Sequence, residues 1–350
     1  MLQHSKYMAR CIELAILGLG NVSPNPMVGA VIVCGDRIIG EGFHMKFGEA
    51  HAEVNAIKNV YDIFPDAEEL LKRSILYVNL EPCAHFGKTP PCADVIISNK
   101  IPTVVVGCRD PFTQVNGKGI ERLENAGIEV LEGIMESDCL ELNKRFYTRV
   151  LKQRPYIILK WAQSRDGFFA PEDGAQRWIT SRPAKQLVHR WRSEEDAILI
   201  GKNTANIDNP HLNVREWSGE NPVRIIIDKN LELSNDLNIF DQSQDTIILN
   251  ALKTEVIGKI KYLELENFDI LLPQLICYQL YLMDIQSVII EGGAKILNLF
   301  ISADLWDEAR VFTGPECWAK GIASPVLRGE SFEPINVGPD TLQVWRNSLT

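Results

Sequence analysis

Short apolar segments of strand length alternate with segments of helical periodicity along most of the chain. In the first 150 residues the predicted order is helix Tyr7–Leu17, strands Val28–Val33 and Arg37–Phe43, helix His51–Val60, strand Ile75–Leu80, helix Cys92–Ser98, strand Thr103–Gly107, helix Gly119–Ala126, strand Ile128–Leu131 and helix Ser137–Val150. Cys34-Gly35-Asp36 predicts a hairpin between the first two strands. This alternation predicts an α/β fold with a central sheet between helices.

A polar segment that ends in proline interrupts the alternation. Lys152-Gln153-Arg154 precedes Pro155, and an apolar strand, Tyr156–Ala162, begins at once. Because 350 residues are about twice the usual size of one domain, we place a boundary here and expect domains at residues 1–150 and 151–350. The second part is predicted to continue with helix Arg182–Arg192, strands Ala197–Ile200, Val223–Ile227 and Ser287–Ile290, and a helix from Ala294, whereas residues 229–275 show no clear period.

The charge of the chain argues against polyanion partners. The net charge is −10, and residues 1–150 alone carry 15 Lys and Arg against 19 Asp and Glu. Nucleic-acid binding usually needs a basic surplus, so we expect small-molecule substrates instead. No apolar run is long enough to span a membrane and no signal-peptide pattern is visible, so we expect a cytoplasmic protein with reduced cysteines. Six cysteines in mostly apolar surroundings are predicted to be core residues: Cys11, Cys34, Cys108, Cys139, Cys277 and Cys317.

A metal-binding pattern lies in the first domain. His51 and Glu53 open a predicted helix, Cys83 follows a predicted strand, and Cys92 begins the next helix. One His and two Cys ligands leave the fourth position of Zn²⁺ open for water, as in catalytic rather than structural sites. Glu53 is then the general acid and base that moves a proton from water to the leaving amine. Zinc deaminases carry His-x-Glu followed by Pro-Cys-x-x-Cys, and this chain departs from that pattern because eight residues separate its two cysteines.

The residues around this pattern resemble a known family. Glu81-Pro82-Cys83-Ala84-His85-Phe86-Gly87-Lys88-Thr89-Pro90-Pro91-Cys92 and Asn25-Pro26-Met27-Val28-Gly29 are similar to the deaminase domain of the bifunctional riboflavin-biosynthesis deaminase-reductases. The resemblance implies a cytidine-deaminase-like α/β/α domain. Its substrate would be 2,5-diamino-6-ribosylamino-4(3H)-pyrimidinone 5′-phosphate, deaminated by hydrolysis. The segments implied to line the pocket contain Asn25, His44, His85, Lys88 and Asp110; for the two histidines a surface-loop position remains open.

The second domain resembles the reductase half of the same family. The matching segments are Lys160–Gly167, Trp178–Ser181, Ala197–Thr204 and Asp208–Arg215, although Phe168 stands where the family more often has a basic residue. The resemblance implies a dihydrofolate-reductase-like α/β domain that uses NADPH to reduce the ribosyl group of 5-amino-6-(5-phosphoribosylamino)uracil to ribityl. It implies NADPH contacts for Ala162, Trp178, Thr204 and Asp208, and substrate contacts for Gln176, Arg192, Leu212 and Arg215.

A Gly-Gly turn follows the last predicted strand of this domain. Glu291-Gly292-Gly293 leads into a helix whose exposed amides could bind phosphate, but the sequence lacks the full dinucleotide-binding G-x-G-x-x-G. By resemblance Glu291 contacts the substrate. The same resemblance assigns NADPH contacts to Gly293, Ala294, Lys295, Ile296, Leu297, Asn298 and Leu299.

Two other functions remain as alternatives. One is a nucleic-acid-editing zinc deaminase with an appended binding domain, which the acidic balance of both halves disfavours. The other is a zinc-stabilised interaction protein, which would need a fourth ligand that is not clearly placed. The sequence leaves open the oligomeric state, homo-oligomers included, and any channelling between sites. It also does not discriminate NADPH from NADH by residue chemistry alone.

Overall fold

The chain forms two compact units. The computed structural model describes residues 2–84, 90–112, 115–172 and 177–348. The units are Met1–Gln153 and Arg154–Thr350. The boundary expected after residue 150 falls inside the last helix of the first unit, α7 (Lys144–Lys152).

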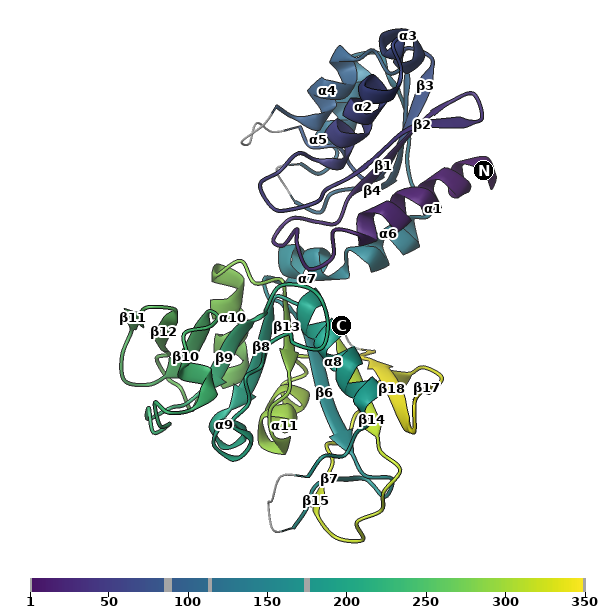
Figure 1. The fold of residues 1–350 in the computed structure, drawn as a ribbon. Coiled ribbons are helices and arrows are strands. Elements are labelled where there is room, and N and C mark those ends of the chain that lie inside the picture. Colours follow the sequence, from purple (N-terminus) through teal and green to yellow (C-terminus); the bar gives the residue numbers. More distant parts are fainter. Residues whose placement is uncertain (1, 85–89, 113–114, 173–176, 349–350) are drawn as a thin grey trace. The chain divides into compact units, whose positions relative to one another are not determined.

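The first unit contains a five-stranded mixed sheet (Figure 1). Its strands are β1 (Gly29–Cys34), β2 (Arg37–Phe43), β3 (Ser74–Leu80), β4 (Thr103–Cys108) and β5 (Glu129–Leu131). The order across the sheet is β2-β1-β3-β4-β5. The predicted hairpin of β1 and β2 is confirmed, and β3, β4 and β5 are parallel. The carboxyl ends of β3 and β4 are therefore neighbours.

Helices cover both faces of this sheet, which confirms the predicted α/β/α layering. They are α1 (Leu2–Ile16), α2 (Ala52–Ile63), α3 (Ala67–Leu71), α4 (Cys92–Ser98), α5 (Lys118–Asn125), α6 (Glu136–Leu142) and α7. Alternate residues of one strand serve opposite layers: Ile32 packs in the cluster with residues of α2, α3, α4 and α5, whereas Val31 packs with residues of α1 and α6.

The helix predicted over Ser137–Val150 is wrong in one respect, because it is two helices. Asn143 lies between α6 and α7, and its side chain bonds the backbone of Met27 on both sides, accepting from the N–H at 2.8 Å and donating to the C=O at 2.9 Å. A side chain committed to another backbone segment competes with helix continuation at that residue.

The second unit contains an eleven-stranded sheet and a small two-stranded one. The strands are β6 (Tyr156–Gln163), β7 (Phe168–Ala170), β8 (Ala197–Gly201), β9 (Val223–Ile227), β10 (Thr246–Asn250), β11 (Glu255–Ile257), β12 (Ile260–Glu264), β13 (Ser287–Ile290), β14 (Glu308–Thr313), β15 (Ile322–Ala323), β16 (Glu330–Ser331), β17 (Ile335–Val337) and β18 (Asp340–Arg346). The large sheet has the order β11-β12-β10-β9-β8-β13-β6-β14-β18-β16, and β17 pairs with β18. Its seven central strands, β12 to β14, are parallel.

Helices again lie on both faces of the large sheet. They are α8 (Arg182–Glu194), α9 (Lys202–Asp208), α10 (Leu272–Leu282) and α11 (Ala294–Ser302), with a short 3-10 turn at Asn238–Phe240. Residues of α10 and α11 share one core cluster, whereas α8 and α9 pack in clusters with the alternate residues of the same strands. The α/β class predicted for this half is confirmed.

Two expectations about this chain need correction. Residues 229–275, where no period was visible, hold β10, β11 and β12 and the start of α10. Of the six predicted core cysteines, Cys317 is exposed and Cys34 is half-buried, whereas the other four are buried. The prediction for Cys317 is therefore wrong.

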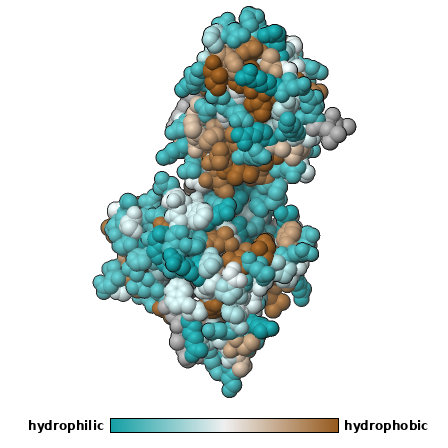
Figure 2. All heavy atoms as spheres, turned by 45° about the vertical axis from the view of Figure 1, so that its right-hand side comes forward, coloured by the Kyte–Doolittle hydropathy of each residue, from teal (hydrophilic) through white to brown (hydrophobic). Residues whose placement is uncertain are grey.

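The surface is mostly polar, with apolar patches on both units (Figure 2). Exposed apolar residues of the first unit include Leu17 and Phe47, and those of the second include Val256 and Ile270. Among the residues that the structure describes, no helix is long and apolar enough to cross a membrane.

Candidate active sites

Three side chains of the first unit converge at the amino-terminal ends of two helices. His51 immediately precedes α2, Cys92 is the first residue of α4, and Cys83 lies three residues after β3. The His51 Nδ1 lies 3.2 Å from the Cys92 Sγ and 3.7 Å from the Cys83 Sγ. All three ligand atoms lie within 4.8 Å of one another.

This arrangement fits a zinc ion. Tetrahedral bonds of about 2.0 Å to nitrogen and 2.3 Å to sulfur place the two atoms about 3.6 Å apart, which the two nitrogen–sulfur separations bracket. The Cys92 side chain and then the His51 imidazole lower the pKa of the Cys83 thiol, to about 4. A thiolate is the form that binds metal. Among the described residues the cluster offers three ligands, so one tetrahedral position stays open.

Glu53 lies in the first turn of α2, beside the three ligands. It is buried, with 3% of its surface exposed. Burial, with the nearby charge of Cys83 adding to it, raises the pKa of this carboxyl to about 7. A carboxyl with such a pKa can both accept and release a proton near neutral pH, which is what a general acid and base must do.

Asn25 and His44 are joined by a hydrogen bond in the same unit. The His44 Nδ1 lies 3.1 Å from the carbonyl oxygen of Ala50, which can only accept, so Nδ1 carries the hydrogen. The His44 Nε2 therefore accepts from the Asn25 amide at 3.1 Å. His44 is buried, so it is not a surface-loop residue, and its ring lies edge-on to that of His51 with centroids 5.4 Å apart.

Of the remaining pocket residues expected in this unit, one is described by the structure and two are not. Asp110 is buried, and its carboxylate accepts the backbone N–H of Phe112 at 2.8 Å. His85 and Lys88 lie outside the described residues.

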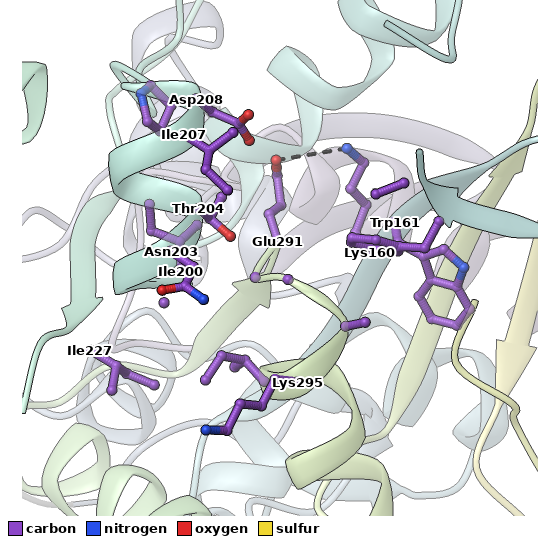
Figure 3. A pocket seen from close by; sticks show the side chains of 18 of the residues that line it. Lys160, Trp161, Ile200, Asn203, Thr204, Ile207, Asp208, Ile227, Glu291 and Lys295 are labelled. Carbon is purple, nitrogen blue, oxygen red and sulfur yellow. Dashed lines mark ion pairs between the residues drawn. The ribbon is translucent and has the colours of Figure 1, made fainter. Parts of the chain in front are cut away.

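The second unit holds a cavity of about 1160 Å³. It lies beyond the carboxyl ends of β6, β8 and β13, where ligands usually bind in open parallel sheets. The expected residues that line it are Ala162, Trp178, Arg192, Thr204, Asp208, Leu212, Arg215, Glu291, Gly293, Ala294, Lys295, Ile296 and Leu299. Figure 3 shows Thr204 and Asp208 on one helix, α9, and Lys295 near the start of α11.

Two expected cavity residues are placed differently, and a third cannot be compared. Leu297 is buried in the core and Asn298 is exposed, and neither lines the cavity. Within α11, Ile296 and Leu299 lie on the side that lines the cavity, whereas Leu297 and Asn298 lie on other sides of the helix. Gln176 lies outside the described residues.

An ion cluster forms one wall of this cavity. The Arg192 guanidinium binds both oxygens of Glu291, at 2.9 and 3.2 Å. The Lys160 Nζ lies 3.7 Å from the Glu291 Oε2, and Figure 3 shows this ion pair. Lys160 and Glu291 meet because β6 and β13 pair with Leu159 opposite Ile290. Burial opposes the charge of Glu291, but Arg192 and Lys160 outweigh it and hold the pKa at about 2.

A second contact of helix α8 reaches the loop that carries Arg215. The backbone N–H of Arg215 donates to the His189 Nδ1 at 3.3 Å, and the Arg215 side chain donates to the Asn213 side chain at 2.9 Å. Burial and then the charges of Arg192 and Arg215 lower the pKa of His189 to about 4, so its ring is neutral near pH 7.

Sequence reasoning assigned no role to Lys160 or His189, although both line the cavity. A signal existed for Lys160, since a single lysine inside an otherwise apolar, buried strand is rarely left without a partner. His189 gave no signal, because a histidine on an amphipathic helix fits an ordinary surface position equally well.

Comparisons with known proteins cover almost the whole chain. The family model described as the RibD C-terminal domain matches residues 155–333, and that of the cytidine and deoxycytidylate deaminase zinc-binding region matches residues 1–108. The riboflavin biosynthesis protein RibD of Aquifex aeolicus is 40% identical over 93% of this chain and 91% of its own length. The RibD protein of Escherichia coli is 35% identical over 90% and 88%, respectively.

Solved structures agree with these relatives. A Thermotoga maritima protein is described as a diaminohydroxyphosphoribosylaminopyrimidine deaminase and 5-amino-6-(5-phosphoribosylamino)uracil reductase. It is 36% identical, with a TM-score of 0.90 and 99% coverage of both chains. Acinetobacter baumannii RibD is 32% identical, with a TM-score of 0.89 over 99% of both chains. These matches favour the riboflavin-biosynthesis prediction over a nucleic-acid-editing deaminase. The chain belongs to the RibD family, the bifunctional enzymes of riboflavin biosynthesis that join a zinc-binding deaminase domain to an NADPH-dependent reductase domain.

Proposed function

We propose that the first unit hydrolyses the exocyclic amine of a diaminopyrimidinone that carries a ribosylamino 5′-phosphate, and that the second unit reduces the ribosyl group of the product. The observation that carries the proposal is the convergence of His51, Cys83 and Cys92 beside the buried carboxyl of Glu53. The same chain holds a large cavity walled by an ion cluster, which fits the second reaction.

For the deaminase, the three ligands hold zinc and Glu53 moves the proton. Bound zinc supplies a Lewis acid that makes water a good nucleophile near neutral pH. The Glu53 carboxylate takes a proton from the attacking water and returns it to the departing amino nitrogen, so that ammonia leaves as a neutral molecule. The raised pKa of Glu53 suits both transfers.

Asn25 is suited to bind the pyrimidine ring by hydrogen bonds. His44 accepts one N–H of the Asn25 amide, which fixes the orientation of that amide. The amide oxygen and the other N–H then remain available for the ring edge of the substrate. Asp110 and, by resemblance, Lys88 complete the proposed substrate contacts.

For the reductase, the cavity fits a dinucleotide together with a second molecule. Drug-sized ligands occupy about 300–1,000 Å³, and this cavity of about 1160 Å³ exceeds that range. Bound NADPH supplies the hydride. Thr204, Asp208 and the first turn of α11 with Lys295 are the proposed cofactor contacts, since a helix amino terminus favours phosphate.

Arg215 is the proposed phosphate contact of the second substrate. The Arg192 fork is occupied by Glu291, whereas Arg215 is exposed at the cavity and its backbone is held by His189. Arg192 therefore acts by fixing the Glu291 carboxylate, and Arg215 offers a guanidinium to the phosphate oxygens.

We place the enzyme in the cytoplasm, with small phosphorylated pyrimidines as its substrates. None of the eight cysteines forms a disulfide, which fits a reducing compartment.

Two assays on the same variants test the proposal. Glu53→Gln should keep its zinc and lose ammonia release by about 10²–10⁴-fold. The same variant should still oxidise NADPH when given the deaminated ribosylaminouracil phosphate. Asp208→Ala combined with Arg215→Ala should release ammonia normally and leave the ribosyl group unreduced. If both activities fall together in folded, zinc-loaded variants, the assignment of one reaction to each unit is wrong.

A further inference from the structure

We call residues 81–84 and 90–94, which carry Cys83 and Cys92, the metal-ligand loop. The first turn of α5 contacts this loop on the amino-terminal side of Cys83. Glu81, two residues before Cys83, is buried with 4% of its surface exposed. Its two carboxylate oxygens accept four backbone N–H groups at 2.9 to 3.5 Å, those of Asp110, Gly117, Gly119 and Ile120. A buried carboxylate with four donors fixes two chain segments against each other.

Two glycines allow the start of α5 to lie this close to the metal-ligand loop. Gly117 has a φ of +77°, in the left-handed region that favours glycine. A Cβ at Gly119 would lie 1.9 Å from the carbonyl oxygen of Pro82, the residue between Glu81 and Cys83. The turn therefore rests directly on the backbone of the metal-ligand loop, with no room for a side chain.

Arg122, one turn further along α5, contacts residues of the metal-ligand loop that follow each of the two cysteines. Its guanidinium binds the two carboxylate oxygens of Asp94 at 2.6 and 2.8 Å, and Asp94 lies two residues after Cys92. Its third nitrogen donates to the carbonyl of Ala84 at 3.3 Å, and Ala84 follows Cys83 directly. One side chain thus links the segments that carry the two cysteine ligands.

We propose that Glu81 and Arg122 are positioning residues of the zinc centre. Acting through the backbone on either side of Cys83 and through Asp94 beyond Cys92, they fix the separation of the two sulfur ligands. Groups that orient metal ligands typically contribute 10–100-fold to metal affinity or activity. The inference rests on the zinc-binding deaminase domain and concerns how tightly that domain holds its metal.

The chain offers a matched control for Arg122. Arg109 forms the same fork with Glu132, at 2.7 and 3.1 Å. The two arginine side chains are similarly exposed, 57% for Arg109 and 42% for Arg122. Arg109→Met therefore removes an equivalent ion pair that, unlike the pair of Arg122, binds neither Asp94 nor Ala84.

The experiment measures zinc release from the full-length protein. Purified zinc-loaded protein is mixed with an excess of a chromogenic chelator, well below the unfolding temperature. Arg122→Met should release zinc about 10-fold faster than the unmodified protein, and Arg109→Met at the unmodified rate. Arg122→Lys should release zinc at an intermediate rate, because one ammonium can bind Asp94 or Ala84 but not both. Glu81→Gln should also accelerate release, since its amide nitrogen would face two of the four donors.

A spectrum and a second activity separate positioning from folding. In cobalt-substituted protein the thiolate-to-cobalt absorption bands report ligand geometry, and they should shift in Arg122→Met but not in Arg109→Met. NADPH oxidation shows that the second unit is intact, and the far-ultraviolet circular dichroism spectrum of each zinc-loaded variant serves as the folding control for the first unit.

Two results would overturn the inference. One is release of zinc by both Arg122→Met and Glu81→Gln at the unmodified rate. The other is equal acceleration by Arg109→Met, which would indicate a general loss of stability. If Glu81→Gln does not fold, the exposed pair of Arg122 and Asp94 still decides the outcome. A failure of the proposed deaminase itself is distinguishable, because the unmodified protein would then bind no zinc or release no ammonia.

Discussion

The ion cluster in the second unit predicts a defined dependence of stability on pH. Glu291 is buried, and Arg192 and Lys160 overcome the effect of burial and lower its pKa from 4.5 to about 2. Each unit of pKa corresponds to about 1.4 kcal/mol, so the charged carboxylate contributes roughly 3 kcal/mol to the free energy of unfolding near neutral pH. Glu291→Gln removes this titration and keeps the side-chain volume.

The sign follows from linkage between protonation and folding. Because the folded pKa lies below the unfolded one, the contribution is complete well above pH 4.5 and is lost as pH falls towards 2. Between pH 6.0 and 3.5 the loss from this carboxyl is about 1.4 kcal/mol. Protonation of the buried His189 also lowers the free energy of unfolding as pH falls through this range, and it does so in both proteins.

Tryptophan fluorescence isolates the relevant unit. All seven tryptophans of the chain lie between residues 154 and 350, so urea unfolding followed by their emission reports on the second unit alone. The stability difference between the unmodified protein and Glu291→Gln should narrow by about 1.4 kcal/mol from pH 6.0 to pH 3.5. The exposed Glu266→Gln serves as control and should show a constant difference. A constant difference for Glu291→Gln as well would refute the idea that the cluster holds this carboxyl charged.

Three further predictions concern the first unit. Cys83→Ser should lose zinc and ammonia release, and a fully metallated variant by elemental analysis would contradict the ligand assignment. Asn143→Ala leaves the buried N–H of Met27 without its partner, whereas the C=O of Met27 keeps the Asn79 amide at 3.0 Å, so the change should cost about 1–3 kcal/mol, measured by thermal unfolding; a cost below about 0.5 kcal/mol would contradict it. Gly119→Ala forces a Cβ to within 1.9 Å of the Pro82 carbonyl and should reduce ammonia release while NADPH oxidation continues; unchanged ammonia release would show that this contact is not needed.

Local chemistry was sufficient to predict most of the regular elements of the first unit, although it missed the short helix α3 (Ala67–Leu71). The strand Arg37–Phe43 and the helix Cys92–Ser98 have the predicted bounds, because a turn at Gly35 and a proline at residue 91 mark their starts. The break at Asn143 could not be predicted, since its cause is a hydrogen bond to Met27, 116 residues away in sequence. In the same way β10 is a strand because it pairs with β9 and β12, and its own sequence shows no period that predicts it.

The metal cluster was predictable and most of the cavity chemistry was not. His51, Cys83 and Cys92 belong to a pattern whose residue types allow few other uses. The charge cluster of the second unit depends on the pairing of β6 with β13 and on helix α8, which bring Lys160, Glu291 and Arg192 together from distant positions. Only the folded sheet register shows that these three side chains meet.

Each unit holds a buried carboxyl, and the pKa values of the two are shifted in opposite directions because their neighbouring charges differ. Burial, with the charge of Cys83 adding to it, raises the pKa of Glu53 to about 7, so this carboxyl can exchange a proton at neutral pH. Glu291 lies between an arginine and a lysine and has a pKa of about 2, so it remains an anion throughout the neutral range. Environments that separate the pKa values of two similar groups assign them different chemistry. We therefore expect proton transfer at Glu53, whereas Glu291 remains an anion that holds Arg192 and Lys160 at the cavity wall.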